Sequence, residues 1–163
     1  MTAKIQVHIR RIRCEAFAAE ADAAATMYLA SRRMLMPGVH NPHTDAETRT
    51  WMRDVVFTRH SVRLAEVDGD IVGLASRDGV WLMNLYVKPG WTGHGIGTQL
   101  LRAMIANAAS TTAVLRVSTF ARNAHASRFF ENRGFRAVGT GDGSANEEHE
   151  PDLRYERSTR DLI

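Results

Sequence analysis

The segment from Leu85 to Thr98 has the residue types and spacing to hold a phosphate group. A short apolar run, Leu85-Tyr86-Val87, leads into a glycine-rich stretch and then into a helical pattern that begins at Ile96. Glycines let a ligand approach the backbone closely, and the first N–H groups of a helix are unpaired donors at the positive end of its dipole. The segment therefore predicts an anion-binding turn between a strand and a helix.

Two familiar phosphate loops do not fit this spacing. A P-loop requires a lysine before Ser or Thr, and the stretch has none at that position. A dinucleotide fingerprint requires a third glycine where Thr98 stands, and an acidic residue about 20 positions further on, where none occurs.

The distribution of charge supports an anionic ligand near this turn. The chain carries a net charge of +3, and no Asp or Glu lies between Asp78 and Glu131. The basic residues inside that stretch are Lys88, Arg102, Arg116, Arg122 and Arg128. The sign reverses near the end of the chain, with Asp142, Glu147, Glu148, Glu150 and Asp152. We therefore predict a positive site for a polyanion and an acidic loop that favours a cationic second ligand.

The remaining sequence predicts the elements that position these residues. Hydrophobic periodicity and turn signals indicate a strand at 5–9, helices at 15–33 and from Thr44, strands at 61–67, 71–76 and 80–87, a helix at 96–109, a strand at 113–119, a helix between Asn123 and Gly134, and strands at 135–138 and 153–157. Asp68-Gly69 and Asp78-Gly79 are strong hairpin signals. This order predicts an α/β fold with a mixed sheet and helices on its faces, in a single domain over residues 1–163.

Composition narrows the class of protein. The first residues lack an apolar signal region, and no apolar stretch is long enough to span a membrane, so we expect a cytoplasmic protein that does not bind membranes. Cys14 is the single cysteine, and the seven histidines have no spacing typical of metal ligands, so we expect no metal site. The arginine clusters are too short to favour nucleic-acid binding.

Two motifs resemble those of the GCN5-related N-acetyltransferase (GNAT) superfamily. Gly93-His94-Gly95-Ile96-Gly97 after a Leu-Tyr-Val strand is similar to the family's acetyl-CoA-binding turn, and Asn123-x-x-Ala126-x-x-Phe129-Phe130 is similar to its next helix. The tail, Asp142-Gly143-Ser144-x-Asn146-Glu147-Glu148, is similar to that of a bacterial subset of the family. The resemblance implies a mostly antiparallel sheet of six or seven strands, splayed between strands 4 and 5 and flanked by about four helices.

The resemblance also implies how acetyl-CoA or CoA would bind. Its pyrophosphate would be held by the backbone of Thr92, Gly93, His94, Gly95, Ile96, Gly97 and Thr98. Val87 would pair with the pantetheine arm, and the N–H groups of Leu85 and Tyr86 would polarise the thioester carbonyl. Residues beside the arm and adenosine would be Asn123, Ala126, Phe129, Phe130 and Arg133, although Asn123 is equally suited to capping its helix.

The catalytic acid and base stay open at this level. Phe130 stands where many family members have a tyrosine that protonates the departing thiolate; Tyr86 or Tyr155 could replace it, or the thiolate could leave without help. Candidates for the base are His40, His43, Glu147 and Glu148, and these four residues together with Asn84 are the candidates for binding the acceptor. His149 and Asp152 are further candidates for the base. We give Glu148 and Tyr155 as the catalytic candidates beside Leu85 and Tyr86.

These features together predict an N-acetyltransferase. It would transfer the acetyl group of acetyl-CoA to a primary amine by direct attack in a ternary complex, with a small cationic molecule as acceptor. A homodimer would be in keeping with the family. The alternative is a non-catalytic acyl-CoA-binding sensor or partner-binding module that retains the cofactor groove without an acid and a base.

Overall fold

A seven-stranded sheet organises the molecule, for which the computed structural model describes residues 4–163. The strand order is β1-β2-β3-β4-β5-β7-β6. The strands are β1 (His8–Arg10), β2 (Ser61–Val67), β3 (Asp70–Asp78), β4 (Trp81–Val87), β5 (Val114–Phe120), β6 (Arg136–Gly141) and β7 (Asp152–Ser158). All neighbouring strands in this sheet pair antiparallel except β4 and β5, which are parallel. The predicted mixed, mostly antiparallel sheet is confirmed.

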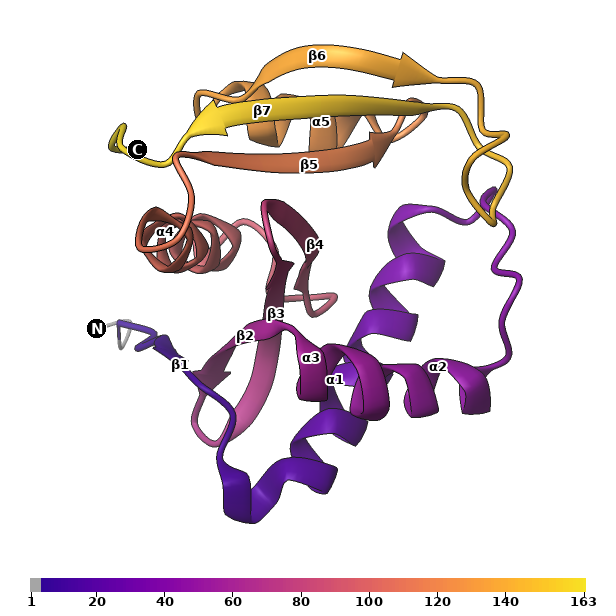
Figure 1. The fold of residues 1–163 in the computed structure, drawn as a ribbon. Helices are drawn as coiled ribbons and strands as arrows, with labels where there is room; N and C mark the ends of the chain where they lie inside the picture. Colours follow the sequence, from indigo (N-terminus) through magenta and orange to yellow (C-terminus); the bar gives the residue numbers. More distant parts are fainter. Residues whose placement is uncertain (1–3) are drawn as a thin grey trace.

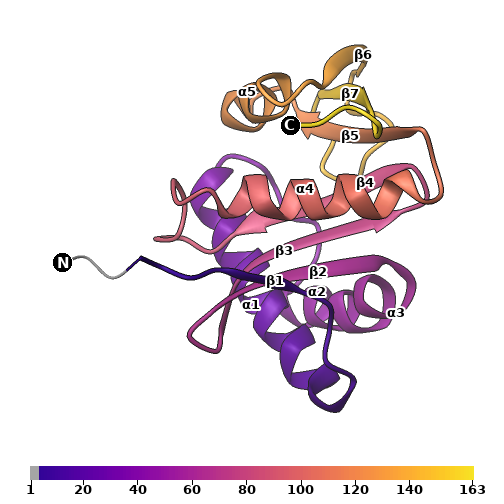
Figure 2. The ribbon, with the colours of Figure 1, turned by 90° about the vertical axis from the view of Figure 1, so that its left-hand side faces the viewer.

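Helices cover both faces of the sheet (Figures 1 and 2). Helix α1 (Phe17–Leu35) follows a short 3₁₀ turn (Cys14–Ala16), and α2 (Asp45–Trp51) continues through a π-helical turn (Met52–Val56) into α3 (Phe57–Arg59). These helices pack against β2 and β3 on what we call the α1 face. Helices α4 (Ile96–Ala109) and α5 (Ala124–Glu131) lie on the opposite, α4 face.

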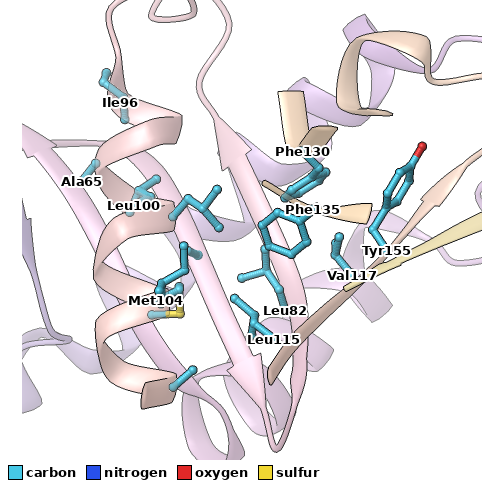
Figure 3. Packing of buried hydrophobic residues seen from close by; sticks show 14 of the residues in the cluster. Ala65, Leu82, Ile96, Leu100, Met104, Leu115, Val117, Phe130, Phe135 and Tyr155 are labelled. Atoms are coloured by element: carbon cyan, nitrogen blue, oxygen red, sulfur yellow. The ribbon is translucent and has the colours of Figure 1, made fainter. Parts of the chain in front are cut away.

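The larger core lies on the α4 face. Leu100, Leu101 and Met104 of α4 are fully buried against β2 to β5, and Phe130 and Phe135 extend the same cluster beneath α5. Figure 3 shows Leu100 and Met104 on α4, with Phe130 and Phe135 farther along the same cluster. The i, i+4 spacing of Ile96, Leu100 and Met104 puts them on one side of the helix, which fixes α4 and hence the turn that precedes it.

Local signals in the sequence account for where the helices begin and end. Thr44 and Glu47 form the predicted capping box of α2, each side chain accepting a hydrogen bond from the other's backbone N–H. Asn123 caps α5 by accepting a hydrogen bond from the N–H of Ala126. Gly134 follows α5 with φ of 83°, the left-handed conformation that favours glycine at a helix end.

The sheet divides at β4 and β5. Trp81 and Arg116 are the one residue pair that joins these two strands in the described part of the chain, and the N–H of Arg116 donates to the Val80 carbonyl. Beyond this point the strands separate toward their carboxyl ends. A change of register near Met83 marks a bulge in β4 that accompanies the separation. We call the unpaired region, residues 82–87 of β4 and 117–120 of β5, the splay.

The predicted elements agree with the structure to within a few residues. The helix predicted at 96–109 has those bounds, and both Asp-Gly turns connect antiparallel strands. The first strand begins later than predicted, at His8, and a part of the predicted range 5–9 precedes it. Among the described residues, no helix has the length and apolar character to cross a membrane.

Candidate functional site

The glycine-rich turn lies at the open end of the splay, where β4 ends. Gly90, Gly93 and Gly95 have φ of 88°, 79° and 76°, a backbone conformation that side chains other than glycine rarely adopt. No atom outside the turn lies within 4 Å of where a Cβ would be at these three positions, so the space in front of the backbone is free. The N–H groups at the start of α4 have no partner inside the helix and can bind an anion there.

His94 closes the turn on itself. Its Nδ1 lies 3.2 Å from the Trp91 carbonyl and 3.0 Å from the Thr92 carbonyl. Because carbonyl oxygens only accept hydrogen bonds, Nδ1 must carry the proton and donate. The His94 side chain therefore holds the shape of the turn, and the predicted contact with a phosphate falls to the backbone.

The register of β4 decides which backbone groups face the splay. The N–H of Lys88 donates to the Val72 carbonyl (2.8 Å), so these two residues form a hydrogen-bonded pair. Such pairs alternate along an antiparallel ladder. Tyr86 therefore directs its backbone to β3, whereas Leu85 and Val87 direct theirs to the splay. This corrects the prediction that Leu85 and Tyr86 both present an N–H to a ligand: the register leaves that role to Leu85.

Helix α1 already contacts this backbone edge. Ser31 is fully buried, and its hydroxyl donates to the Val87 carbonyl (2.9 Å). Because the Val87 carbonyl is engaged by Ser31, the Val87 N–H is the backbone group of this residue that can bind a ligand in the splay.

Helix α5 approaches the turn from across the splay. A Cβ on Gly97 would lie 3.3 Å from the Phe129 ring, so the absence of a side chain at Gly97 allows α4 and α5 to come close. Ala126 is partly buried, and Asn123 has its predicted capping role. Phe130 is 5% exposed and packs edge-on against Phe129 and Phe135, so it belongs to the core. The prediction placed Phe130 beside the cofactor, but its ring is not available to contact a ligand.

A basic pocket of about 420 Å³ lies beside the first turn of α4. Arg133 donates to the Thr98 hydroxyl at 3.0 and 2.7 Å, and its guanidinium lies 3.8 Å from the centre of the Phe129 ring. Burial and then the nearby charge of Arg102 lower the pKa of Arg133. Three arginines, Arg102, Arg133 and Arg157, and one aspartate, Asp161, line the pocket. The pocket therefore has a surplus of positive charge suited to an anion.

The β6–β7 loop, residues 142–151, lies against the α1 face at the same end of the sheet (Figure 1). Each of its glutamates is paired with a basic side chain of another element. Glu147 contacts His43 (2.6 Å), Glu148 contacts Arg32 (3.1 Å) and Glu150 contacts Arg122 (3.0 Å). The predicted acidic loop exists, but Glu148 and Glu150 are paired with arginines and Glu147 contacts a histidine within the chain.

Tyr86 connects the carboxyl end of β4 to this loop. Its ring packs edge-on against Tyr28 of α1 with centroids 4.8 Å apart, and Arg32 donates to the Tyr28 hydroxyl (3.0 Å) and to Glu148. Burial of the Tyr86 hydroxyl, with a contribution from Tyr28, raises its pKa well above the ordinary value. Glu148 is thus the one predicted catalytic side chain that the structure brings near Tyr86.

The other predicted side chains lie away from the splay or are already engaged. Tyr155 is 1% exposed, and its hydroxyl donates to Glu131 (3.0 Å) at the end of α5. Asn84 is 4% exposed and donates to the Ser76 hydroxyl (2.8 Å), so its amide serves the interior of the α1 face and not an acceptor. His40 is exposed on the loop between α1 and α2.

Sequence reasoning missed Tyr28, Ser31 and Arg32. They lie near the end of an alanine-rich helix and form no local motif. Their partners are distant in sequence: Ser31 and Val87 are 56 positions apart, and Arg32 and Glu148 are 116 positions apart. No group of His, Cys, Asp or Glu side chains within residues 4–163 could hold a metal ion.

Solved structures share this fold over nearly the whole chain. The GCN5-related N-acetyltransferase of Rhodopseudomonas palustris is 24% identical, with a TM-score of 0.73 over 97% of this chain and 99% of its own. The ribosomal-protein-alanine N-acetyltransferase of Brucella melitensis is 21% identical, with a TM-score of 0.73 over 93% and 99%. The acetyltransferase yncA of Salmonella typhimurium, solved with acetyl-CoA, is 18% identical, with a TM-score of 0.71 over 97% and 96%.

The sequence itself matches the same family. No curated protein matches the chain. A family model of the acetyltransferase (GNAT) domain, however, matches residues 58–137, which include β4, the glycine-rich turn and α5. With the splayed sheet and the turn at its open end, the match shows that residues 58–137 are similar to an acetyltransferase (GNAT) domain.

Proposed function

We propose that this protein transfers the acetyl group of acetyl-CoA to a primary amine by direct attack in a ternary complex. The observation that carries the proposal is the splay, with the glycine-rich turn at its open end and the Leu85 and Val87 backbone along its edge. Acetyl-CoA supplies a thioester and a pyrophosphate, which are the two groups this arrangement suits. The Salmonella protein solved with acetyl-CoA has the same fold.

Each part of the cofactor has a fitting partner in the chain. The N–H groups from Thr92 to Thr98 would bind the pyrophosphate, and the Val87 N–H would bind the pantetheine arm. The basic pocket formed with Arg102 and Arg133 would take the phosphate on the adenosine ribose. Phe129, beneath the Arg133 guanidinium, would lie beside the arm.

The reaction would proceed from the α1 face. The amine nitrogen attacks the thioester carbonyl carbon, a C–N bond forms, and the C–S bond breaks to release the thiolate of CoA. The Leu85 N–H stabilises the negative charge that develops on the carbonyl oxygen. Glu148 would accept the proton that the amine loses, directly or through water. The thiolate needs little help to leave, since a thiol has a pKa of about 8.5.

The acceptor is proposed as a primary amine. A preference for a small cation stays a prediction, and it loses part of its support because Glu147, Glu148 and Glu150 have partners within the chain. The Brucella relative, a ribosomal-protein-alanine N-acetyltransferase, makes a peptide amino terminus an equally reasonable candidate to test.

A thermal shift experiment tests the cofactor first. Ligand at 100 times its dissociation constant adds about 2.7 kcal/mol of stability, so acetyl-CoA and CoA should raise the Tm by several degrees and NAD should not. Thiol release would then be measured with polyamines, aminoglycosides, amino acids and a peptide with an amino-terminal alanine. Binding without thiol release from any amine would favour a non-catalytic acyl-CoA-binding module, and the absence of any shift would refute the proposal.

A further inference from the structure

The splay is bounded on its α1 face by side chains that converge on Arg32. The Arg32 side chain is 11% exposed, whereas that of the neighbouring Arg33 is 64% exposed. Burial of a guanidinium is costly unless its charge and its donors are satisfied. Arg32 meets this requirement with Tyr28 of its own helix and Glu148 of the β6–β7 loop, and we infer that it is the positioning residue for the amine acceptor.

The contacts of Arg32 form a continuous chain from the β6–β7 loop to β4. Its guanidinium donates to Oε1 of Glu148 at 3.1 and 3.2 Å and to the Tyr28 hydroxyl at 3.0 Å. The Tyr28 ring packs in turn against Tyr86. Burial opposes the charge on Arg32, but Tyr28, Tyr86 and Glu148 outweigh it and raise the pKa of Arg32. The guanidinium therefore keeps its charge and its hold on both partners.

This chain of contacts bridges the two halves of the sheet. Tyr28 and Arg32 belong to α1, which packs with β3 and β4, whereas Glu148 lies in the loop between β6 and β7 on the other side of the splay. The second bridge, between His43 and Glu147, joins two side chains that are 49% and 71% exposed. An exposed pair of this kind contributes little. The pair of Arg32 and Glu148 is thus the stronger of the two bridges from the loop to the α1 side, while Glu150 and Arg122 (3.0 Å) join the loop to the segment after β5.

Arg32 acts through Glu148 and Tyr86, and it contacts none of the groups assigned to acetyl-CoA. The glycine-rich turn and the basic pocket lie on α4 and α5, and the contacts that shape them involve His94, Thr98 and Arg133. Loss of Arg32 should therefore free the loop and displace Glu148 without changing the cofactor site. This inference rests on the proposed function, because it assigns the α1 face to the acceptor.

The experiment compares Arg32→Gln with a matched control, Arg33→Gln. Arg33 is also an arginine at the end of α1 in an ion pair, with Asp45, but it contacts neither the β6–β7 loop nor Tyr28. The full chain is assayed with the best amine of the panel, and KM is measured separately for the amine and for acetyl-CoA. We expect Arg32→Gln to raise the amine KM by at least about tenfold, because a displaced Glu148 would lose one charge-assisted contact with the amine, and to leave the acetyl-CoA KM unchanged. Arg33→Gln should change neither, and Arg32→Lys should recover part of the loss.

Two further measurements keep the test decisive. Hydrogen exchange should rise in residues 142–151 of Arg32→Gln and stay unchanged in the glycine-rich turn. If no amine is acetylated, thiol release from acetyl-CoA to water should increase in Arg32→Gln, because the freed loop admits water to the thioester. Equal behaviour of Arg32→Gln and Arg33→Gln, or an equal rise in both KM values, would overturn the role of Arg32. Failure of the wild-type protein to bind acetyl-CoA would instead overturn the proposed function.

Discussion

The two sides of the splay are built by different means. On the α4 face, the glycine-rich turn depends on backbone conformation, with three glycines at positive φ and a helix that begins at Ile96. On the α1 face, the β6–β7 loop depends on side chains, with Arg32, His43 and Arg122 each paired to one of its glutamates. One side is specified by a short segment of sequence and the other by contacts between distant segments.

This difference corresponds to two tasks, the binding of a cofactor that many proteins share and the binding of an acceptor that differs between enzymes. A backbone cradle binds a phosphate whatever side chains surround it, so it suits a cofactor that many proteins share. Ion pairs between loops can change by single substitutions, so they suit an acceptor that differs from one enzyme to the next. Substitutions on the α4 face should therefore affect cofactor binding, whereas those on the α1 face should affect the acceptor.

The largest effect is expected at Gly95. Gly95→Val places a β-branched residue at φ of 76° directly in front of α4, which distorts the turn and fills the space for an anion. We expect CoA affinity to fall by about 100-fold or more, equivalent to about 2.7 kcal/mol. Isothermal titration calorimetry would measure this change.

Gly79→Val is the matched control for this variant. Gly79 also has a positive φ, 54°, and free space around it, but it lies in the turn between β3 and β4. Both variants should lose stability, by about 1–2 kcal/mol for the strained backbone, and only Gly95→Val should lose CoA. A Gly95→Val protein that binds CoA normally would show that the turn has no part in cofactor binding.

A smaller effect is expected in the basic pocket. Arg102 is exposed and lines the pocket, so Arg102→Gln removes positive charge there without disturbing the core. We expect the preference for CoA over dephospho-CoA to fall by about tenfold, as for one charge-assisted contact. Arg128→Gln, an exposed change on α5, should leave the preference unaltered. Equal preferences in the wild type and Arg102→Gln would place the ribose phosphate elsewhere.

The same contrast explains what could be predicted from the sequence. The turn, the capping box at Thr44 and the helix that begins at Ile96 are local patterns, so they were found with their correct bounds. The partners of Glu148 and of Tyr155 could not be found, because their pairing requires the fold to bring α1 and α5 to them. Charge counting also failed to show that Glu148 and Glu150 of the β6–β7 loop are paired with arginines, since a sequence does not reveal which charges meet.

A pH measurement tests the enclosed environment of Tyr86. Burial raises the pKa of this tyrosine, so near pH 10 the unfolded state loses a proton that the folded state keeps. The free energy of unfolding should therefore decrease as the pH rises above about 10, by up to about 1.4 kcal/mol per pH unit for this group. Tyr86→Phe should remove that part of the decrease. Urea unfolding at pH 9 to 11 would measure it, and identical slopes in both proteins would mean that the hydroxyl is open to solvent.

The smallest effect on turnover is expected at Tyr155. Its ring is buried in the core of the α4 face, and its hydroxyl donates to Glu131 at the end of α5, so its proton is already engaged. Tyr155→Phe should keep kcat within about twofold of the wild type while it lowers the free energy of unfolding by about 1 kcal/mol, the typical contribution of one hydrogen bond. Steady-state thiol release and urea unfolding would measure the two quantities. A large fall in kcat without loss of stability would make Tyr155 the catalytic acid and would require the β7 strand to move during turnover.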